Sequence, residues 1–165
     1  MTQKLVAAAD AALDMSFVTD WLAVGAAILT SDQLAIALGY GVTHVLDCRT
    51  PRQDPPPAAT CGTVAWFCAP TEDDGQAREA QWYEGCLQAS DLVRPDRHLI
   101  YVHCAKGVNR SPAAAYVILR SHGWSPAGAA RLILCRRPAA ADTYFRDAEA
   151  NVGQLRPELR WVGAS

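Results

Sequence analysis

One stretch of the chain brings together a thiol, a glycine-containing turn and an arginine. It reads His103-Cys104-Ala105-Lys106-Gly107-Val108-Asn109-Arg110-Ser111, and we call these residues the signature loop. A cysteine attacks as its thiolate, of which little exists at neutral pH when the pKa is about 8.5. Backbone N–H groups converging in a turn would stabilise a thiolate and bind an anion. Because the planar fork of Arg110 can hold two oxygens of one phosphoryl group, the pattern predicts phosphoryl transfer through a cysteinyl-phosphate.

The flanking sequence predicts how this loop is positioned. Residues 98–103 form a compact apolar run typical of a buried strand, and residues 111–122 have a helical pattern. Gly107 can adopt the positive φ that a tight turn needs, and Pro112 falls in the first helical turn, where its missing N–H costs nothing. A lone cysteine is usually a structural residue. The full pattern H-C-x-x-G-x-x-R-[ST], however, arises by chance in a chain of this composition with a probability on the order of 10⁻⁴.

A leaving oxygen needs a proton, and an acidic cluster stands where a proton donor is expected. Glu72, Asp73 and Asp74 follow an apolar run at 64–68 and precede a helical pattern at 77–93. The end of a strand in a parallel α/β sheet is where ligands bind. One carboxyl group of this cluster could act first as acid and then as base. The alternative is an ordinary solvated turn.

The remaining pattern predicts an α/β fold with a central, mostly parallel sheet flanked by helices. Strands are expected within 17–25 and at 43–48, and helices at 30–38, from Ser125-Pro126 to about 136, and from Asp142 to about 151. Residues 51–62 are proline-rich and are expected to form a loop. Residues 1–15 are expected to be a short helix or frayed extension, and 16–165 one catalytic domain.

Composition excludes several classes of protein. The formal net charge is −2, which argues against a general nucleic-acid or membrane-surface binder. The six cysteines have no metal-ligand spacing, so neither a metal nor another cofactor is expected. No secretion signal or membrane span is apparent, so a cytoplasmic protein with reduced thiols is expected.

The signature loop resembles that of the cysteine-dependent protein tyrosine phosphatases, and the layout is similar to their dual-specificity subgroup. The resemblance covers about residues 16–153 and includes W-L-A-V-G at 21–25 and G-V-T-H-V-L at 41–46. It implies a fold of that kind and hydrolysis of phosphotyrosine, with phosphoserine and phosphothreonine also accepted, in a phosphoprotein or phosphopeptide. It implies the following roles: Cys104 as nucleophile, Arg110 as phosphate clamp, Ser111 as a donor to the sulfur, His103 as support for the loop and the low thiol pKa, and the backbone of Ala105, Lys106, Gly107, Val108 and Asn109 as the pocket lining.

The resemblance also bears on residues outside the loop. It implies Asp74 as the acid, because several relatives carry their acid directly before a glycine and Asp74 precedes Gly75. Asp73 is the alternative, because other relatives place the acid three residues after a proline, here Pro70. Cys48 is a candidate redox partner that could form a disulfide with oxidised Cys104. Arg49 is expected in a structural ion pair, and Arg136-Arg137 at a helix C-terminus suits the helix dipole.

Other activities remain open within this resemblance. Asn109 also occurs in RNA 5′-triphosphatases, but the second histidine of their loop is Lys106 here. Phosphoinositide phosphatases of this kind carry lysines where Ala105 and Val108 stand. A phosphate-binding module without turnover is a further alternative, although the intact set of Cys104, Arg110 and Ser111 favours an enzyme. The oligomeric state is left open.

Overall fold

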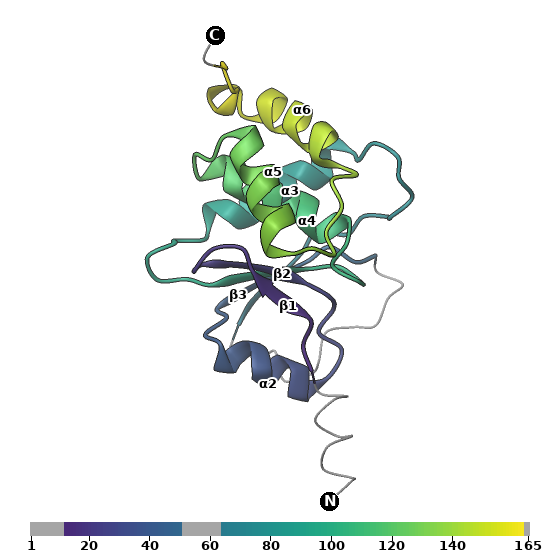
Figure 1. The fold of residues 1–165 in the computed structure, drawn as a ribbon, viewed down its shortest axis with the longest axis vertical. Coiled ribbons are helices and arrows are strands. Elements are labelled where there is room, and N and C mark those ends of the chain that lie inside the picture. The colour runs from purple at the N-terminus through teal and green to yellow at the C-terminus, as the bar shows by residue number, and fades with distance from the viewer. Residues whose placement is uncertain (1–11, 51–63, 164–165) are drawn as a thin grey trace, which may run out of the picture.

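The computed structural model describes residues 12–50 and 64–163, which form one sheet with helices on both faces (Figure 1). The five strands lie in the order β1-β2-β5-β3-β4. Their bounds are β1 Met15–Phe17, β2 Leu22–Gly25, β3 His44–Asp47, β4 Ala65–Cys68 and β5 Ile100–His103. β1 runs antiparallel to β2, and the other pairs are parallel. The predicted α/β class with a mostly parallel sheet is therefore confirmed.

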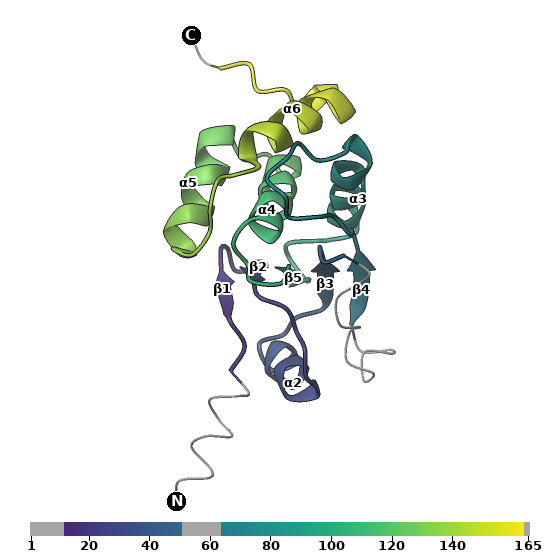
Figure 2. The ribbon, with the colours of Figure 1, turned by 90° about the vertical axis from the view of Figure 1, so that its right-hand side faces the viewer.

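The helices divide unequally between the two faces of the sheet (Figure 2). α2 (Ser31–Gly39) covers one face. The other face carries α3 (Ala80–Asp91), α4 (Arg110–Ser121), α5 (Pro126–Arg136) and α6 (Phe145–Leu155), followed by a short 3₁₀ helix, Pro157–Leu159. No helix in the described part of the chain is long and apolar enough to cross a membrane.

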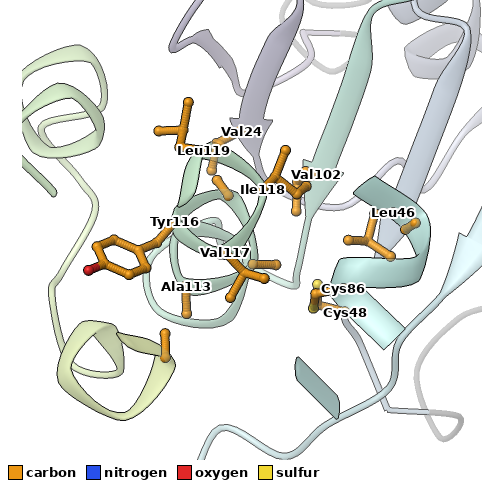
Figure 3. Packing of buried hydrophobic residues seen from close by; sticks show 14 of the residues in the cluster. Val24, Leu46, Cys48, Cys86, Val102, Ala113, Tyr116, Val117, Ile118 and Leu119 are labelled. Carbon is orange, nitrogen blue, oxygen red and sulfur yellow. The ribbon is translucent and has the colours of Figure 1, made fainter. Parts of the chain in front are cut away.

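Two hydrophobic cores follow from the alternation of side chains along the strands. In β5, Ile100 and Val102 belong to the large core beneath α3 to α6, whereas Tyr101 belongs to the smaller core beneath α2. Successive residues of a strand face opposite sides, so a strand buried on both faces contributes to both cores. Helix α4 lies at the centre of the large core, where Val117 and Ile118 pack with Val102 (Figure 3). This packing fixes the end of β5 and the start of α4, between which the signature loop runs.

Most predicted elements are present with small shifts at their ends. The side chain of Thr30 caps α2 by accepting a hydrogen bond from Gln33 N at 3.1 Å, and Ser125 caps α5. The last helix differs from the prediction, because Asp142 is not its cap. Phe145 N donates to Asp142 O in a turn, and α6 begins at Phe145 with Tyr144 as the N-cap residue. The predicted loop at 51–62 and residues 1–11 of the predicted N-terminal helix lie outside the described residues, and Met15 already belongs to β1.

Candidate active site

The signature loop lies at the carboxyl end of the central strand β5, as the sequence predicted. β5 ends at His103 and α4 begins at Arg110. Cys104 is only 1% exposed, so its thiol lies at the bottom of the loop. The strand end and the helix start therefore set the positions of the thiol and the guanidinium.

Every carbonyl between residues 105 and 109 is bonded to a group outside the loop turn. The donors are Ala27 N to Ala105 O (3.3 Å), Arg137 Nη2 to Lys106 O (3.2 Å), Arg137 Nε to Gly107 O (2.6 Å), Ala141 N to Val108 O (2.8 Å) and Ala113 N to Asn109 O (3.2 Å). In a trans peptide the N–H points away from the carbonyl of the same unit. Outward carbonyls therefore turn the following N–H groups inward, and Gly107 N indeed donates to Cys104 Sγ at 3.3 Å.

The Cys104 thiol is buried, yet its pKa is lowered. Burial alone would raise it. The hydroxyl of Ser111, 3.3 Å from Sγ, the backbone N–H of Ser111, the charge of Arg110 and the N–H of Gly107 together outweigh burial. Each of these groups favours the anion over the neutral thiol. The site is thus suited to hold a thiolate.

Gly107 is required by both conformation and space. Its φ is +67°, in the left-handed region that favours glycine. A Cβ at this position would lie 2.5 Å from the carbonyl carbon of Gly25 and would also collide with the Arg137 guanidinium. Any side chain here would displace the cation that holds two of the loop carbonyls.

Arg110 is the first residue of α4 and is 5% exposed. Its Nη1 donates to Thr71 O at 3.0 Å, and its Nε lies 3.8 Å from Asp73 Oδ2. Thr71 and Asp73 belong to residues 69–79, which we call the acidic loop. The guanidinium therefore joins the signature loop to the acidic loop.

Of the two adjacent aspartates, the structure brings Asp73 to the signature loop. Asp73 Oδ2 accepts a hydrogen bond from Asn109 Nδ2 at 3.3 Å. Asp74 lies on the other side of the chain, where it pairs with Arg78 and is about half exposed. Its pKa is lowered, first by the hydrogen bond from Gln76 N and then by Arg78. Asp74 Oδ1 is thereby engaged away from Cys104 and Arg110.

His103 lies behind the loop as a fully buried imidazole. Among the residues that the structure describes, neither of its ring nitrogens has a hydrogen-bond partner. Burial lowers its pKa to about 4, so the ring is neutral at pH 7. It packs against the rings of Trp66 and Tyr101. His103 thus lies behind the loop as a neutral, packed ring.

Two further residues singled out in the sequence lie close by. Cys48 is buried in the large core beside Cys86 (Figure 3), where burial first, and the neighbouring thiols next, raise its pKa well above the ordinary value. Arg49 forms a buried ion pair with Asp47 at 2.8 Å, the structural role expected for it.

Arg137 was expected only to suit the helix dipole, and the sequence did not reveal its role at the signature loop. It is 2% exposed, and its guanidinium binds the carbonyls of Lys106 and Gly107 on one side and the carboxylate of Asp14 on the other, at 2.8 and 2.9 Å. The sequence did indicate that some donor was needed, because a loop whose N–H groups turn inward leaves its carbonyls outside, where they require hydrogen-bond donors. Nothing in the sequence identified which cation supplies them.

Comparison with known proteins agrees with this architecture. No protein-family model and no curated protein sequence matches the chain. Several solved structures, however, do match the chain. Human DUSP28 is 24% identical, with 87% of this chain and 99% of that chain covered and a TM-score of 0.69. PTPMT1, in a complex with PI(5)P, is 17% identical over 86% and 96%, with a TM-score of 0.69. A human tyrosine phosphatase-like serine/threonine/tyrosine-interacting protein is 14% identical over 87% and 99%, with a TM-score of 0.72.

These likenesses extend over nearly the whole length of each matched chain. The protein therefore has the fold of the cysteine-dependent phosphatases. Within that class, its architecture is that of the dual-specificity phosphatases, as the resemblance in layout implied.

Proposed function

We propose that the protein is a phosphatase that hydrolyses phosphate monoesters on proteins, phosphotyrosine first, through a phosphorylated Cys104. The observation that carries this proposal is the buried Cys104 thiol, which accepts a hydrogen bond from Gly107 N and whose pKa is lowered by Ser111, the charge of Arg110 and Gly107. Such a cradle stabilises both a thiolate and the oxygens of a phosphoryl group. A binding module without turnover would need the cradle but not a cysteine at its base.

The first chemical step forms a bond from Cys104 Sγ to phosphorus and breaks the bond from phosphorus to the leaving oxygen. Arg110 binds the oxygens of the transferred group, and the carboxylic acid of Asp73 gives its proton to the leaving oxygen. In the second step the Asp73 carboxylate takes a proton from water, the water oxygen bonds to phosphorus, and the thiolate leaves. Ser111 donates to that sulfur, which supports its departure.

Asp73, rather than Asp74, is assigned as the acid. The support is its oxygen 3.8 Å from Arg110 Nε and its hydrogen bond from Asn109. Asp74 is occupied by Arg78 and Gln76. The matched pair Asp73→Asn and Asp74→Asn tests the choice. Asp73→Asn is expected to lower kcat/KM for phenyl phosphate by about a hundredfold or more, and Asp74→Asn by much less. The reverse result would return the assignment to Asp74.

The surroundings of the site favour a protein substrate over a polyanion. A cavity of about 720 Å³ adjoins the acidic loop, and Thr71, whose carbonyl binds Arg110, is part of its wall. Its wall carries the carboxylates of Glu72, Glu79 and Glu84 and the ion pair of Asp74 with Arg78. Because like charges repel, the excess of negative charge in this wall disfavours a phosphoinositide or an RNA 5′-triphosphate beside the acidic loop. A phosphopeptide carries no such charge density.

A substrate panel without added metal tests the function. Purified protein is assayed against a phosphotyrosine peptide, a phosphothreonine peptide, a phosphoinositide and an RNA 5′-triphosphate. The phosphotyrosine peptide is expected to be hydrolysed fastest. Cys104→Ser is expected to bind phosphate with little turnover, whereas Cys135→Ser, which removes an exposed thiol, serves as the control. Residual activity above about a hundredth in Cys104→Ser would exclude a covalent cysteine step.

A further inference from the structure

We infer that Tyr144 is a positioning residue that holds Asp73 in the orientation needed to give its proton to the leaving group. This inference rests on the proposed function, because it concerns the residue assigned there as the acid. Tyr144 precedes α6 and lies 71 positions along the chain from Asp73. It was not among the residues that the sequence singled out.

The hydroxyl of Tyr144 is fixed in both of its hydrogen-bonding roles. It accepts a hydrogen bond from Gly75 N at 2.9 Å, and it donates to Asp73 Oδ1 at 2.9 Å. The residue is 2% exposed, and the guanidinium of Arg78 lies over its ring, 5.1 Å from the centroid. Because its lone pair receives the Gly75 N–H, its single proton is directed to Asp73.

The second oxygen of Asp73 is oriented from the opposite side. Asn109 Nδ2 donates to Oδ2 at 3.3 Å, and Thr143 Oγ1 donates to Asn109 Oδ1 at 3.0 Å, which fixes the direction of the amide. Two adjacent residues before α6, Thr143 and Tyr144, therefore control the acidic loop and the signature loop together.

This arrangement assigns the two carboxyl oxygens of Asp73 to different tasks. Tyr144 holds Oδ1, so Oδ2 is the oxygen turned toward Arg110. That is the side on which a phosphoryl group held by Arg110 would present its leaving oxygen. The phenol stays protonated throughout, since burial raises its pKa. Tyr144 therefore donates the same hydrogen bond whether Asp73 is acid or carboxylate.

The inference is tested by how kcat/KM depends on the leaving group of the substrate. In Tyr144→Phe the ring and its packing remain, and only the hydroxyl is lost. We expect kcat/KM for phenyl phosphate to fall by about tenfold, a part of the 10²–10⁴-fold effect of a general acid. For p-nitrophenyl phosphate, whose leaving group needs no proton, we expect a change of less than about twofold. kcat/KM is the proper quantity because it reports phosphoryl transfer to Cys104 and not the later hydrolysis.

Tyr116→Phe is the matched control. Tyr116 is also 2% exposed and also donates its phenol proton to a carboxylate, Glu149 Oε2 at 2.8 Å, but it does so away from the two loops. It is expected to lose a similar amount of thermal stability and to show no difference between the two substrates. The double variant Asp73→Asn/Tyr144→Phe is expected to be no worse than Asp73→Asn alone, because Tyr144 acts through Asp73.

The outcomes separate this inference from the proposed function. If Asp73→Asn discriminates between the two substrates and Tyr144→Phe lowers both equally, or lowers neither, the positioning role is refuted and the acid assignment stands. If Asp73→Asn shows no discrimination, the acid assignment itself fails. Should Tyr144→Phe fold poorly, Thr143→Val removes the exposed hydroxyl that orients Asn109, and a loss confined to phenyl phosphate would again support the inference. An equal loss on both substrates would refute it.

Discussion

Acidification is expected to destabilise the fold through the buried imidazole of His103. The carboxylate facing it, Asp47, has Oδ1 3.7 Å from Nδ1. Burial lowers the His103 pKa more than Asp47 raises it, and Arg49 adds to the lowering, so the pKa falls from 6.5 to about 4. The native protein therefore keeps this ring neutral under mildly acidic conditions that protonate it in the unfolded chain.

The size of the effect follows from the two pKa values. Between about pH 4 and 6.5 the unfolded chain binds the proton more readily than the native protein, so the free energy of unfolding rises with pH in that window. The contribution is complete above about pH 6.5 and is lost as the pH falls toward 4. At about 1.36 kcal/mol per pKa unit, the full loss is roughly 3 kcal/mol. That is a large share of the about 5–15 kcal/mol that stabilises a typical domain.

Urea unfolding at several pH values between about 4.5 and 7.5 measures this contribution. His103→Asn and His103→Leu cannot take up the proton, so their free energy of unfolding is expected to vary less steeply with pH than that of the parent. Titration of Asp47 does not affect this comparison between the parent and the His103 variants. Its pKa is lowered below 3.8, because its hydrogen bonds with Arg49 and the charges of His103 and Arg49 outweigh burial, and its contribution is therefore lost only below this window. Parallel curves for parent and variants would refute the reasoning.

Three further outcomes are expected. Arg137→Met leaves two loop carbonyls without a donor, so it should cost about 2–5 kcal/mol of unfolding free energy by urea titration and weaken phosphate binding, whereas the adjacent exposed Arg136→Met should do neither. Ser111→Ala removes a donor to the sulfur, so the pKa of Cys104 should rise; the pH dependence of iodoacetamide alkylation measures it, and an unchanged profile would show that the hydroxyl does not support the thiolate. Mild peroxide should oxidise the Cys104 thiolate to a sulfenic acid, with release of hydroxide, and Cys48 should trap it as a disulfide, with release of water, that reductant reopens. Peptide mapping tests the oxidised site, and unchanged recovery in Cys48→Ser would exclude that partner.

The parts of this protein that sequence predicted are those in which one local segment carries the information. The signature loop is such a segment, because strand, turn and helix follow each other without interruption and only the backbone path must be inferred. The cap of α2 by Thr30 is local in the same way. The mostly parallel sheet followed from apolar runs that alternate with helical patterns, and it is confirmed. The start of α6 was placed too early, since Asp142 has the residue type of a cap but occupies a turn instead.

The sequence favoured Asp74 over Asp73 because of the glycine that follows it, whereas the structure brings Asp73 to the signature loop. The two residues are adjacent and chemically identical, so only the direction of each side chain distinguishes them. That direction depends on Arg78, which engages Asp74, and on Tyr144, which engages Asp73 from the far end of the fold. Arg78 lies in the acidic loop itself, but Tyr144 is 71 positions from Asp73, so no local motif shows that partner. Arg137 was missed for the same reason, because its contacts are with residues about 30 and 123 positions away.

The two halves of the proposed chemistry are therefore held in different ways. The anion cradle is built from backbone N–H groups whose carbonyls are bound outside the loop, so the side chains of Lys106 and Val108 contribute little to it, and Lys106 is exposed. The proton donor is held by side chains alone, through the phenol of Tyr144 and the amide of Asn109. Substitutions at 106 and 108 should then leave phosphate binding largely unchanged, while the loss of one hydroxyl near α6 should weaken proton transfer without weakening binding. Phosphate affinity and acid catalysis can for this reason vary independently in this fold.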